Sequence, residues 1–253
     1  GGRRVTTVCI VQARMSSTRL PGKVMLPLGD TTILDHGLTR CREVPGIDAV
    51  CCAIPDTPDC DVVAVEAERL GASVFRGAEN DVLDRYYQAA RFMNARTILR
   101  VTSDCPLTDP DVCGAVVALR EKENADFACN NMPPSWPHGL DCEVVTFEWL
   151  ERAANEATKK FEREHVMPFI RNHPDAHIVN LEGPGGHTVD HRWTIDTAPD
   201  YEFFKALWLH LPMGREGWSY KKVLEIVDAN SDLQTINAGQ DRLEGLKKSM
   251  RES

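Results

Sequence analysis

Short runs of β-branched and small apolar residues alternate with helix-like stretches through the first half of this 253-residue chain. A crossover that carries a helix joins parallel strands. The alternation therefore predicts a doubly wound, mostly parallel α/β sheet, with a ligand site at the carboxyl ends of its strands. On this basis we expect strands at 5–11, 48–54, 73–75 and 97–101, and helices at 31–43, 60–70 and 82–94.

The pattern is less regular after residue 125, where turn residues separate shorter apolar runs. We interpret residues 1–253 as a single domain in which residues 130–190 are an inserted α+β segment that caps the sheet. The expected strands in this half are 125–129, 140–147, 177–181 and 193–195, and the expected helices are 147–157, 162–172, 199–210 and 220–228.

A loop rich in cations and hydroxyl groups, residues 13–23, follows the first expected strand and is called the cationic loop below. It contains Arg14, Arg19 and Lys23 beside three hydroxyl residues and a Pro-Gly break. Fixed cations on a loop at the carboxyl end of a strand suit a polyanion such as a nucleoside triphosphate. Neither a Walker A loop nor a G-x-G-x-x-G dinucleotide motif is present. The alternative interpretation is a solvated charged loop.

A second candidate feature is the end of the strand expected at 97–101. Asp104 follows Val101-Thr102-Ser103, at the same predicted rim as the cationic loop. A carboxylate in this position is well placed for Mg²⁺, which binds few protein carboxylates together with substrate phosphate oxygens. The alternative is that Asp104 caps a turn.

Asp109-Pro110-Asp111 imitates the Asp-x-Asp motif of metal-dependent glycosyltransferases. An aspartate followed by proline is also a helix N-cap with proline at the first helical position. We favour the cap.

A third candidate feature is Asp196, which closes the short apolar run 193–195. It is a candidate second metal ligand, whereas Asp200 is better placed to serve the N-terminus of the following helix. Two carboxylates from distant strand ends and a cationic loop are the components of a metal-dependent phosphoryl or nucleotidyl transferase.

Charge and composition exclude several other classes. The formal net charge of −9 argues against broad nucleic-acid binding, which needs a basic face. There is no long apolar run or signal peptide, so we expect no membrane association and a cytoplasmic location. The nine cysteines include no Cys-x-x-Cys pair, so neither a zinc ribbon nor a thioredoxin-type site is supported, and buried thiols are expected.

With these motifs in place, the chain resembles the cytidylyltransferases that make CMP-activated acidic sugars, the CMP-acylneuraminate and CMP-ketodeoxyoctonate synthetases. It is most similar to the branch named after a spore-coat polysaccharide biosynthesis protein. The resemblance runs from residue 8 to about residue 229. The motifs that carry it are 12–23, 75–77 with 81–86, 100–106 and 195–200. Ser16 departs from this pattern, because glycine is common at that position.

The resemblance implies a role for each matching residue. The triphosphate would be held by Arg14, Ser17, Arg19 and Lys23, with Ala13 and the Arg76-Gly77 segment near the cytosine. Asp104 and Asp196 would bind Mg²⁺, the one expected cofactor. Gln12, Arg100, Thr102 and Ser103 complete the expected nucleotide site. A homodimer formed through 130–190 is also a family-level expectation, with Trp136 and its neighbouring prolines expected to be exposed.

The acceptor site is expected in the middle segment. Polar groups alternate along 138–143, and Glu164-His165 lie within an expected helix. A structural polar network is the alternative to a pocket. The candidate acceptor-binding residues are His138, Asp141, Glu143, His165 and Arg192, with Arg100 and Arg192 as the cations for an acidic group.

These motifs together predict a CTP-dependent nucleotidyltransferase. It would transfer CMP to a nonulosonic or octulosonic acid, or to a phosphonate, and release pyrophosphate, with Arg14, Arg19, Lys23 and Asp104 as the catalytic set. Two alternatives remain open at this point: a glycosyltransferase that uses a nucleotide-sugar donor, and a non-catalytic nucleotide-binding subunit.

Overall fold

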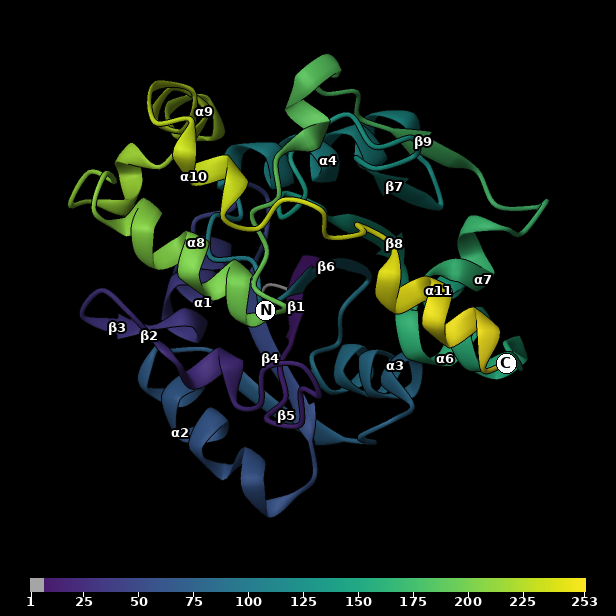
Figure 1. Ribbon diagram of the computed structural model, residues 1–253. Helices are drawn as coiled ribbons and strands as arrows, with labels where there is room; N and C mark the ends of the chain where they lie inside the picture. The colour runs from purple at the N-terminus through teal and green to yellow at the C-terminus, as the bar shows by residue number, and fades with distance from the viewer. Residues whose placement is uncertain (1–6) are drawn as a thin grey trace.

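The computed structural model describes residues 7–253, so Val5 and Thr6 of the first expected strand lie outside the described residues. A seven-stranded sheet crosses the centre of the molecule in the order β5-β4-β1-β6-β8-β7-β9 (Figure 1). The strands are β1 Thr7–Gln12, β4 Ala49–Pro55, β5 Ser73–Gly77, β6 Thr97–Thr102, β7 Phe127–Cys129, β8 Glu143–Thr146 and β9 Ile178–Asn180. A separate two-stranded pair joins β2 Pro27–Leu28 to β3 Thr31–Thr32.

Helices cover both faces of this sheet (Figure 1). Side-chain caps begin several of them: Thr32 caps α1, Asp81 caps α3 and Asp109 caps α4. The α-helices are α1 Ile33–Arg42, α2 Asp61–Arg69, α3 Val82–Phe92, α4 Pro110–Glu123, α5 Phe147–Glu156, α6 Lys160–His165, α7 Pro168–Arg171, α8 Ala198–Trp208, α9 Tyr220–Ala229, α10 Asp232–Thr235 and α11 Glu244–Arg251.

Strand direction confirms the predicted fold class. β1 is parallel to β4 and β6, β4 is parallel to β5, and β7 is parallel to β9. β8 pairs antiparallel with both β6 and β7, so in this sheet it alone runs against the others. The carboxyl ends of the parallel strands and the start of β8 therefore share one rim of the sheet. The loops after Val11, Ile54 and Val101 meet there, as the alternation predicted.

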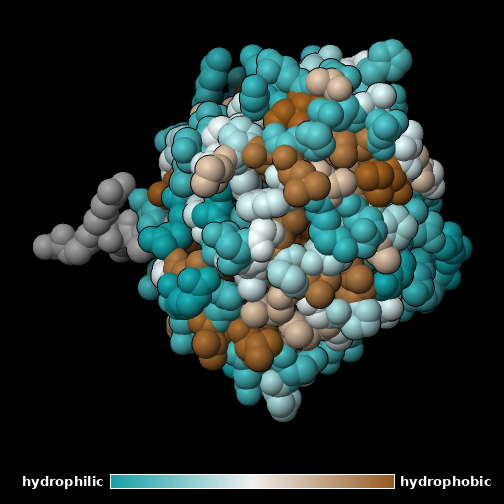
Figure 2. Space-filling view, turned by 60° about the vertical axis from the view of Figure 1, so that its left-hand side comes forward, coloured by the Kyte–Doolittle hydropathy of each residue, from teal (hydrophilic) through white to brown (hydrophobic). Residues whose placement is uncertain are grey.

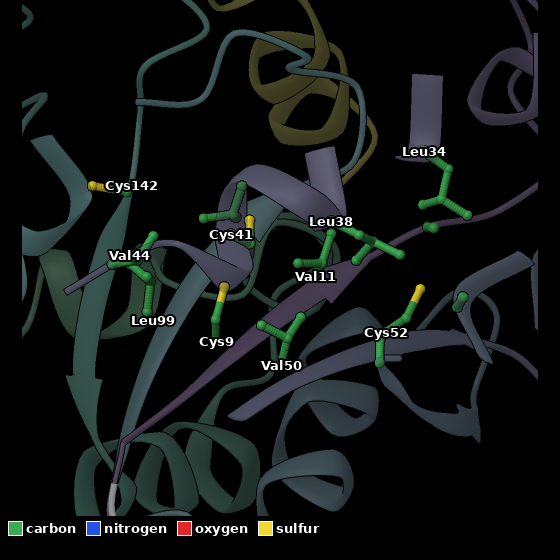
Figure 3. Close-up of a cluster of buried hydrophobic side chains, with 14 of the residues drawn as sticks. Cys9, Val11, Leu34, Leu38, Cys41, Val44, Val50, Cys52, Leu99 and Cys142 are labelled. Atoms are coloured by element: carbon green, nitrogen blue, oxygen red, sulfur yellow. The ribbon is translucent and has the colours of Figure 1, made fainter. Parts of the chain in front are cut away.

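Alternate residues of β1 build the cores on opposite faces of the sheet, as the period of two in a strand requires. Cys9 and Val11 are fully buried against α1, α2 and α4, and Figure 3 shows both pointing into this cluster. Val8 and Ile10 are buried on the other face, in a cluster with α3, α5, the Val166-Met167 turn and α7. All nine cysteines are free and buried, which confirms the burial expected for the thiols.

A third core lies beside the sheet and contains Trp193, Trp218 and the apolar face of α8. Within residues 7–253, no helix is both long and apolar enough to cross a membrane. The face shown in Figure 2 carries apolar groups interspersed with polar ones.

Several expected elements are wrong in detail. Residues 193–195 form no strand, because their amides bond to loop residues and not to a strand of the sheet: Trp193 N donates to the His138 carbonyl and Ile195 N to the Asp104 carbonyl, beside a single bridge between Arg192 and His138. The helix expected at 162–172 is two helices, α6 and α7. Val166 breaks them apart with φ 71°, and Pro168 begins the second. The β2–β3 pair, α10 and α11 were not expected.

The segment 130–190 contributes β8 and β9 to the central sheet, along with α5 to α7 beside it. Its treatment as an inserted cap stays a prediction, but the expected exposure of Trp136 is wrong. That side chain is 7% exposed, packs edge-on against Tyr220 and donates a hydrogen bond to the Leu181 carbonyl at 3.1 Å. Both its packing and its hydrogen bond are made within one chain, so Trp136 gives no evidence for a dimer.

Candidate active site

The cationic loop leaves β1 at the rim where the parallel strands end. Three backbone hydrogen bonds fold it: Ser17 N and Gly22 N donate to the Met15 carbonyl, and Lys23 N donates to the Leu20 carbonyl. Gly22 takes φ 69°, a conformation that glycine adopts without steric cost. The resulting turn directs Lys23 back toward the end of β6.

Lys23 joins the two candidate metal carboxylates. Its Nζ lies 3.0 Å from Asp104 Oδ2 and 3.3 Å from Asp196 Oδ1. Arg19 makes a second ion pair with Asp196. The Lys23 side chain is only 12% exposed. The structure thus brings together the cationic loop, the end of β6 and the segment before α8, as the sequence predicted.

The surroundings of Asp104 and Lys23 determine whether these two groups are ionised. Burial opposes charge on Asp104, but Lys23 and the hydroxyl of Thr102, which donates at 2.7 Å, override it and lower the pKa of Asp104 to about 2. Burial lowers the pKa of Lys23, and the neighbouring Asp104 and Asp196 more than restore it, so the pKa lies above its usual value. Both groups are therefore charged near neutral pH.

This ionisation makes a testable contribution to stability. The pKa of Asp104 lies below its unfolded value of 3.8, so the stabilisation is complete above about pH 4 and is lost as pH falls toward 2. We expect Asp104→Asn to lower the free energy of unfolding at pH 7 by ~2 kcal/mol. The deficit should shrink as pH falls from 4 to 2, which urea unfolding of both proteins at each pH measures. A deficit independent of pH would contradict this assignment.

Other residues of the cationic loop face the same space. Arg14 makes no ion pair with any residue in the range 7–253, and it lines the cavities beside the loop. Ser17 is buried at the wall of the larger cavity. Ser16 does not take a positive φ, so glycine is not required there, and its Oγ donates to Glu79 Oε1 at 3.1 Å.

Two cavities that share Arg14 and Lys23 lie on the side of the predicted nucleotide site. The smaller, about 220 Å³, sits directly over the ends of β1 and β6, and the larger, about 1070 Å³, lies between the cationic loop, α6 and α11. The smaller cavity gathers most of the predicted nucleotide-binding residues, and its walls include Gln12, Ala13, Arg14, Lys23, Arg100, Thr102, Ser103 and Asp104.

Two expected nucleotide-binding residues are not brought to these walls. Arg76 pairs with Asp61 of α2 at 2.8 Å, and Gly77 lies beside it at the end of β5. The physical reason is topological: β5 is the edge strand, and β4 separates it from β1. Arg85 of α3 lines the smaller cavity instead and donates to the carbonyls of Ala78 and Glu79 at 2.8 and 2.7 Å.

A third cavity of about 550 Å³ adjoins the carboxylate pair and is called the acceptor cavity below. Its walls contain every residue predicted for the acceptor: His138, Asp141, Glu143, His165 and Arg192, together with Arg100. The sheet explains the clustering, because β8 begins beside the end of β6, with Glu143 opposite Arg100.

Most charges in the acceptor cavity are already paired. Glu143 accepts from Arg100 at 2.7 Å and from Arg171 at 3.1 Å. Arg192 binds Asp200 through Nε and Nη2 at 2.9 and 3.0 Å. Arg100 and Arg192, the predicted cations for an acidic group, are therefore each held by a carboxylate in this structure, and their role toward the acceptor stays a prediction.

Two histidines of this cavity have unsatisfied nitrogens. His138 Nδ1 and His165 Nε2 are buried without a hydrogen-bond partner among the described residues. Burial lowers the pKa of both imidazoles, so they are neutral near pH 7. His165 is followed by a tight turn in which Met167 N donates to the His165 carbonyl at 2.8 Å, with Val166 in its strained positive-φ conformation.

The acidic residues limit what metal could bind. No group of three or more His, Cys, Asp or Glu side chains with metal-site geometry occurs in residues 7–253. Asp104 and Asp196 do converge on one ammonium ion, so they can converge on one cation. Two carboxylates would be too few ligands for a structural metal site. They fit Mg²⁺, whose remaining coordination positions would be filled by phosphate oxygens and water.

Asp109 has no part in this site. Its Oδ1 accepts from the Asp111 and Val112 amides at 2.9 and 3.1 Å, and its Oδ2 accepts from Tyr220 N at 3.0 Å. The predicted helix cap is confirmed. The Asp-x-Asp interpretation is wrong, because this carboxylate is buried and its oxygens are occupied by backbone donors.

Sequence reasoning missed one side of the site. Residues 241–252 line both the acceptor cavity and the larger nucleotide-side cavity. Arg163 of α6 was also missed, and it binds Asp81 at 2.8 Å where α3 begins. The spacing of Leu243, Leu246 and Met250 places them on one helical face and could have revealed α11.

Comparison with known proteins identifies the family of the chain. The model of the cytidylyltransferase family matches residues 8–225. The spore coat polysaccharide biosynthesis protein SpsF of Bacillus subtilis is 33% identical over 233 residues, covering 89% of this chain and 95% of its own.

Solved structures agree in fold. A cytidylyltransferase from Leptospira borgpetersenii superimposes with a TM-score of 0.85 at 32% identity, over 93% of this chain and 98% of its own. A CMP-ketodeoxyoctonate synthetase solved with CTP superimposes with a TM-score of 0.63 at 15% identity, over 81% and 99%, and is similar in fold alone.

The fold and site define an α/β protein of the nucleotidyltransferase type. The chain belongs to the cytidylyltransferase family.

Proposed function

We propose that this protein transfers CMP from CTP to a small acidic acceptor and releases pyrophosphate. The acceptor class is a nonulosonic or octulosonic acid, or a phosphonate, used in surface-polysaccharide or related biosynthesis. One observation carries the proposal: Lys23 of the cationic loop lies between Asp104 and Asp196 at the rim of the sheet. Cations suited to a triphosphate and carboxylates suited to its metal ion thus lie side by side at the rim of the sheet.

The residues of the chain supply binding and electrostatics and form no covalent bond to the substrate. Arg14, Arg19 and Lys23 are positioned to neutralise charge on the triphosphate as the bond between the α- and β-phosphates breaks. The acceptor cavity adjoins Asp104, so an acceptor hydroxyl held there can approach the α-phosphorus opposite the leaving pyrophosphate. Positioning and charge stabilisation account for the chemistry.

Asp104 and Asp196 are the residues that would hold Mg²⁺. The ion would neutralise phosphate charge and lower the pKa of the attacking hydroxyl. For this to happen, Lys23 and Arg19 must exchange carboxylate partners for phosphate oxygens. The pKa of Asp104 below its usual range keeps that carboxylate ionised and ready for a cation at any physiological pH.

A substrate panel tests the proposal. Purified protein is incubated with Mg²⁺ and each of CTP, UTP, GTP and ATP, with 3-deoxy-manno-octulosonate, N-acetylneuraminate or a small phosphonate as acceptor. We expect pyrophosphate release only when CTP and an acidic sugar or phosphonate are both present. A parallel incubation replaces the nucleoside triphosphate with a UDP-sugar, and release of a nucleoside diphosphate there would contradict the proposal and favour a glycosyltransferase. CTP binding without turnover on any acceptor would favour a non-catalytic subunit.

A further inference from the structure

The last part of the chain, residues 237–253, forms one wall of the site and is called the strap below. It contains α11, which packs against α6 (Figure 1). The family model ends at residue 225, so the strap lies outside the part of the chain that the family match covers. It also lies outside the three buried hydrophobic clusters, whose last residue is Leu233.

The strap lies between the two larger cavities. Leu243, Leu246 and Met250 line the acceptor cavity, whereas Lys248 and Ser249 line the cavity beside the cationic loop. Gly245 lines both. An acceptor held beside Asp104 would therefore contact the strap on one side and the strands' rim on the other.

Polar contacts hold the strap in place. Arg242 Nη2 lies 3.0 Å from Asp141 Oδ1, and Arg242 Nη1 donates to the Trp136 carbonyl at 3.1 Å. Ser249 donates to Glu164, and Lys160 pairs with Glu252. Of these contacts, only the Lys160–Glu252 pair is exposed on both sides, and exposed pairs add little to stability. The strap is thus held mainly by polar side-chain contacts to the rest of the chain.

Arg242 differs from the other arginines of the acceptor cavity. Arg192 is held by the fully buried Asp200, and Arg100 by the buried Glu143. Asp141, in contrast, is 30% exposed and keeps two other donors, Asn131 Nδ2 at 3.0 Å and Gly139 N at 3.3 Å. Asp141 therefore stays hydrogen-bonded when Arg242 turns to another anion.

We propose that the strap is the acceptor-recognition element of this enzyme and that Arg242 binds the anionic group of the acceptor. The inference rests on the proposed function and adds the residue that selects an acidic acceptor. A guanidinium fork matches a carboxylate or a phosphonate with two parallel hydrogen bonds. When the acceptor binds, its anionic group would replace Asp141 as the partner of the Arg242 guanidinium.

The test compares Arg242→Gln, Arg242→Lys and wild type, using 3-deoxy-manno-octulosonate and its methyl ester as acceptors. A hydrogen bond to a charged group is worth about 1.5–3 kcal/mol, so Arg242→Gln should raise the KM for the acid about 10- to 100-fold. The KM for CTP should stay within about twofold, and the preference for acid over ester should disappear. Arg242→Lys should fall between the two, because it keeps the charge and loses the fork.

The matched control is Arg251→Gln, because Arg251 is an exposed arginine at the end of α11, within the same strap, and lines none of the three cavities. It should leave both KM values unchanged, and thermal unfolding checks that each variant is folded. An unchanged acid-to-ester preference in Arg242→Gln would overturn the role of the strap while the proposed function stands. A wild-type protein that binds no CTP, or turns over no acidic acceptor, would overturn both.

Discussion

Lys23→Ala should lower the rate of pyrophosphate release from CTP and acceptor by about 100- to 1000-fold, the scale of a lost charge-stabilising donor. Two effects act together. The variant loses a cation that the triphosphate would meet, and it leaves Asp104 without the ammonium 3.0 Å away that keeps its pKa low. Steady-state pyrophosphate release at saturating substrates measures the loss.

Lys221→Ala is the matched control, because Lys221 is exposed on α9 and lines none of the three cavities. Its turnover should equal that of the wild type. Lys23→Arg separates charge from shape and should retain more activity than the alanine variant. Near-wild-type turnover in a folded Lys23→Ala protein would refute the assignment of the cationic loop to the triphosphate.

Asp104→Asn should also lower turnover by at least about 100-fold, because a neutral amide cannot neutralise or hold a divalent cation as a carboxylate does. The substitution keeps the shape of the side chain and can still accept the Thr102 hydroxyl. A titration with Mg²⁺ should show that the variant needs a higher concentration for half-maximal activity. That shift separates a lost metal ligand from a general loss of fold.

Asp111→Asn serves as the control for this charge change. Asp111 is exposed in the first turn of α4 and lines none of the three cavities. We expect wild-type rates and an unchanged Mg²⁺ dependence. An Asp104→Asn protein with wild-type turnover and the same Mg²⁺ dependence would exclude Asp104 as a metal ligand.

The nucleotide side of the site was predictable because it depends on chain direction alone. Lys23 and Asp104 each follow a parallel strand, and parallel strands end at the same rim, so their meeting required no knowledge of side-chain packing. Asp196 was placed at the right point for a partly wrong reason. It follows a segment that is bridged to His138 and belongs to no strand of the sheet.

The acceptor side was less predictable because it depends on which polar groups pair across the fold. Arg100 looks free in the sequence, but Glu143, which comes 43 residues later, neutralises it. Trp136 looks like an exposed ring among prolines, but it is buried beside Tyr220. Such pairings join residues far apart in the sequence, and no local spacing encodes them.

The reversed direction of β8 has a consequence for how the acceptor and nucleotide halves relate. β7 and β6 end at the rim where β8 begins, so the segment 130–142 leaves the sheet and returns to it at the same edge. The length of this connecting segment can change without altering the pairing register of any strand. The strands that carry the proposed nucleotide site can therefore keep their pairing while the segment 130–142, which borders the proposed acceptor site, changes in length.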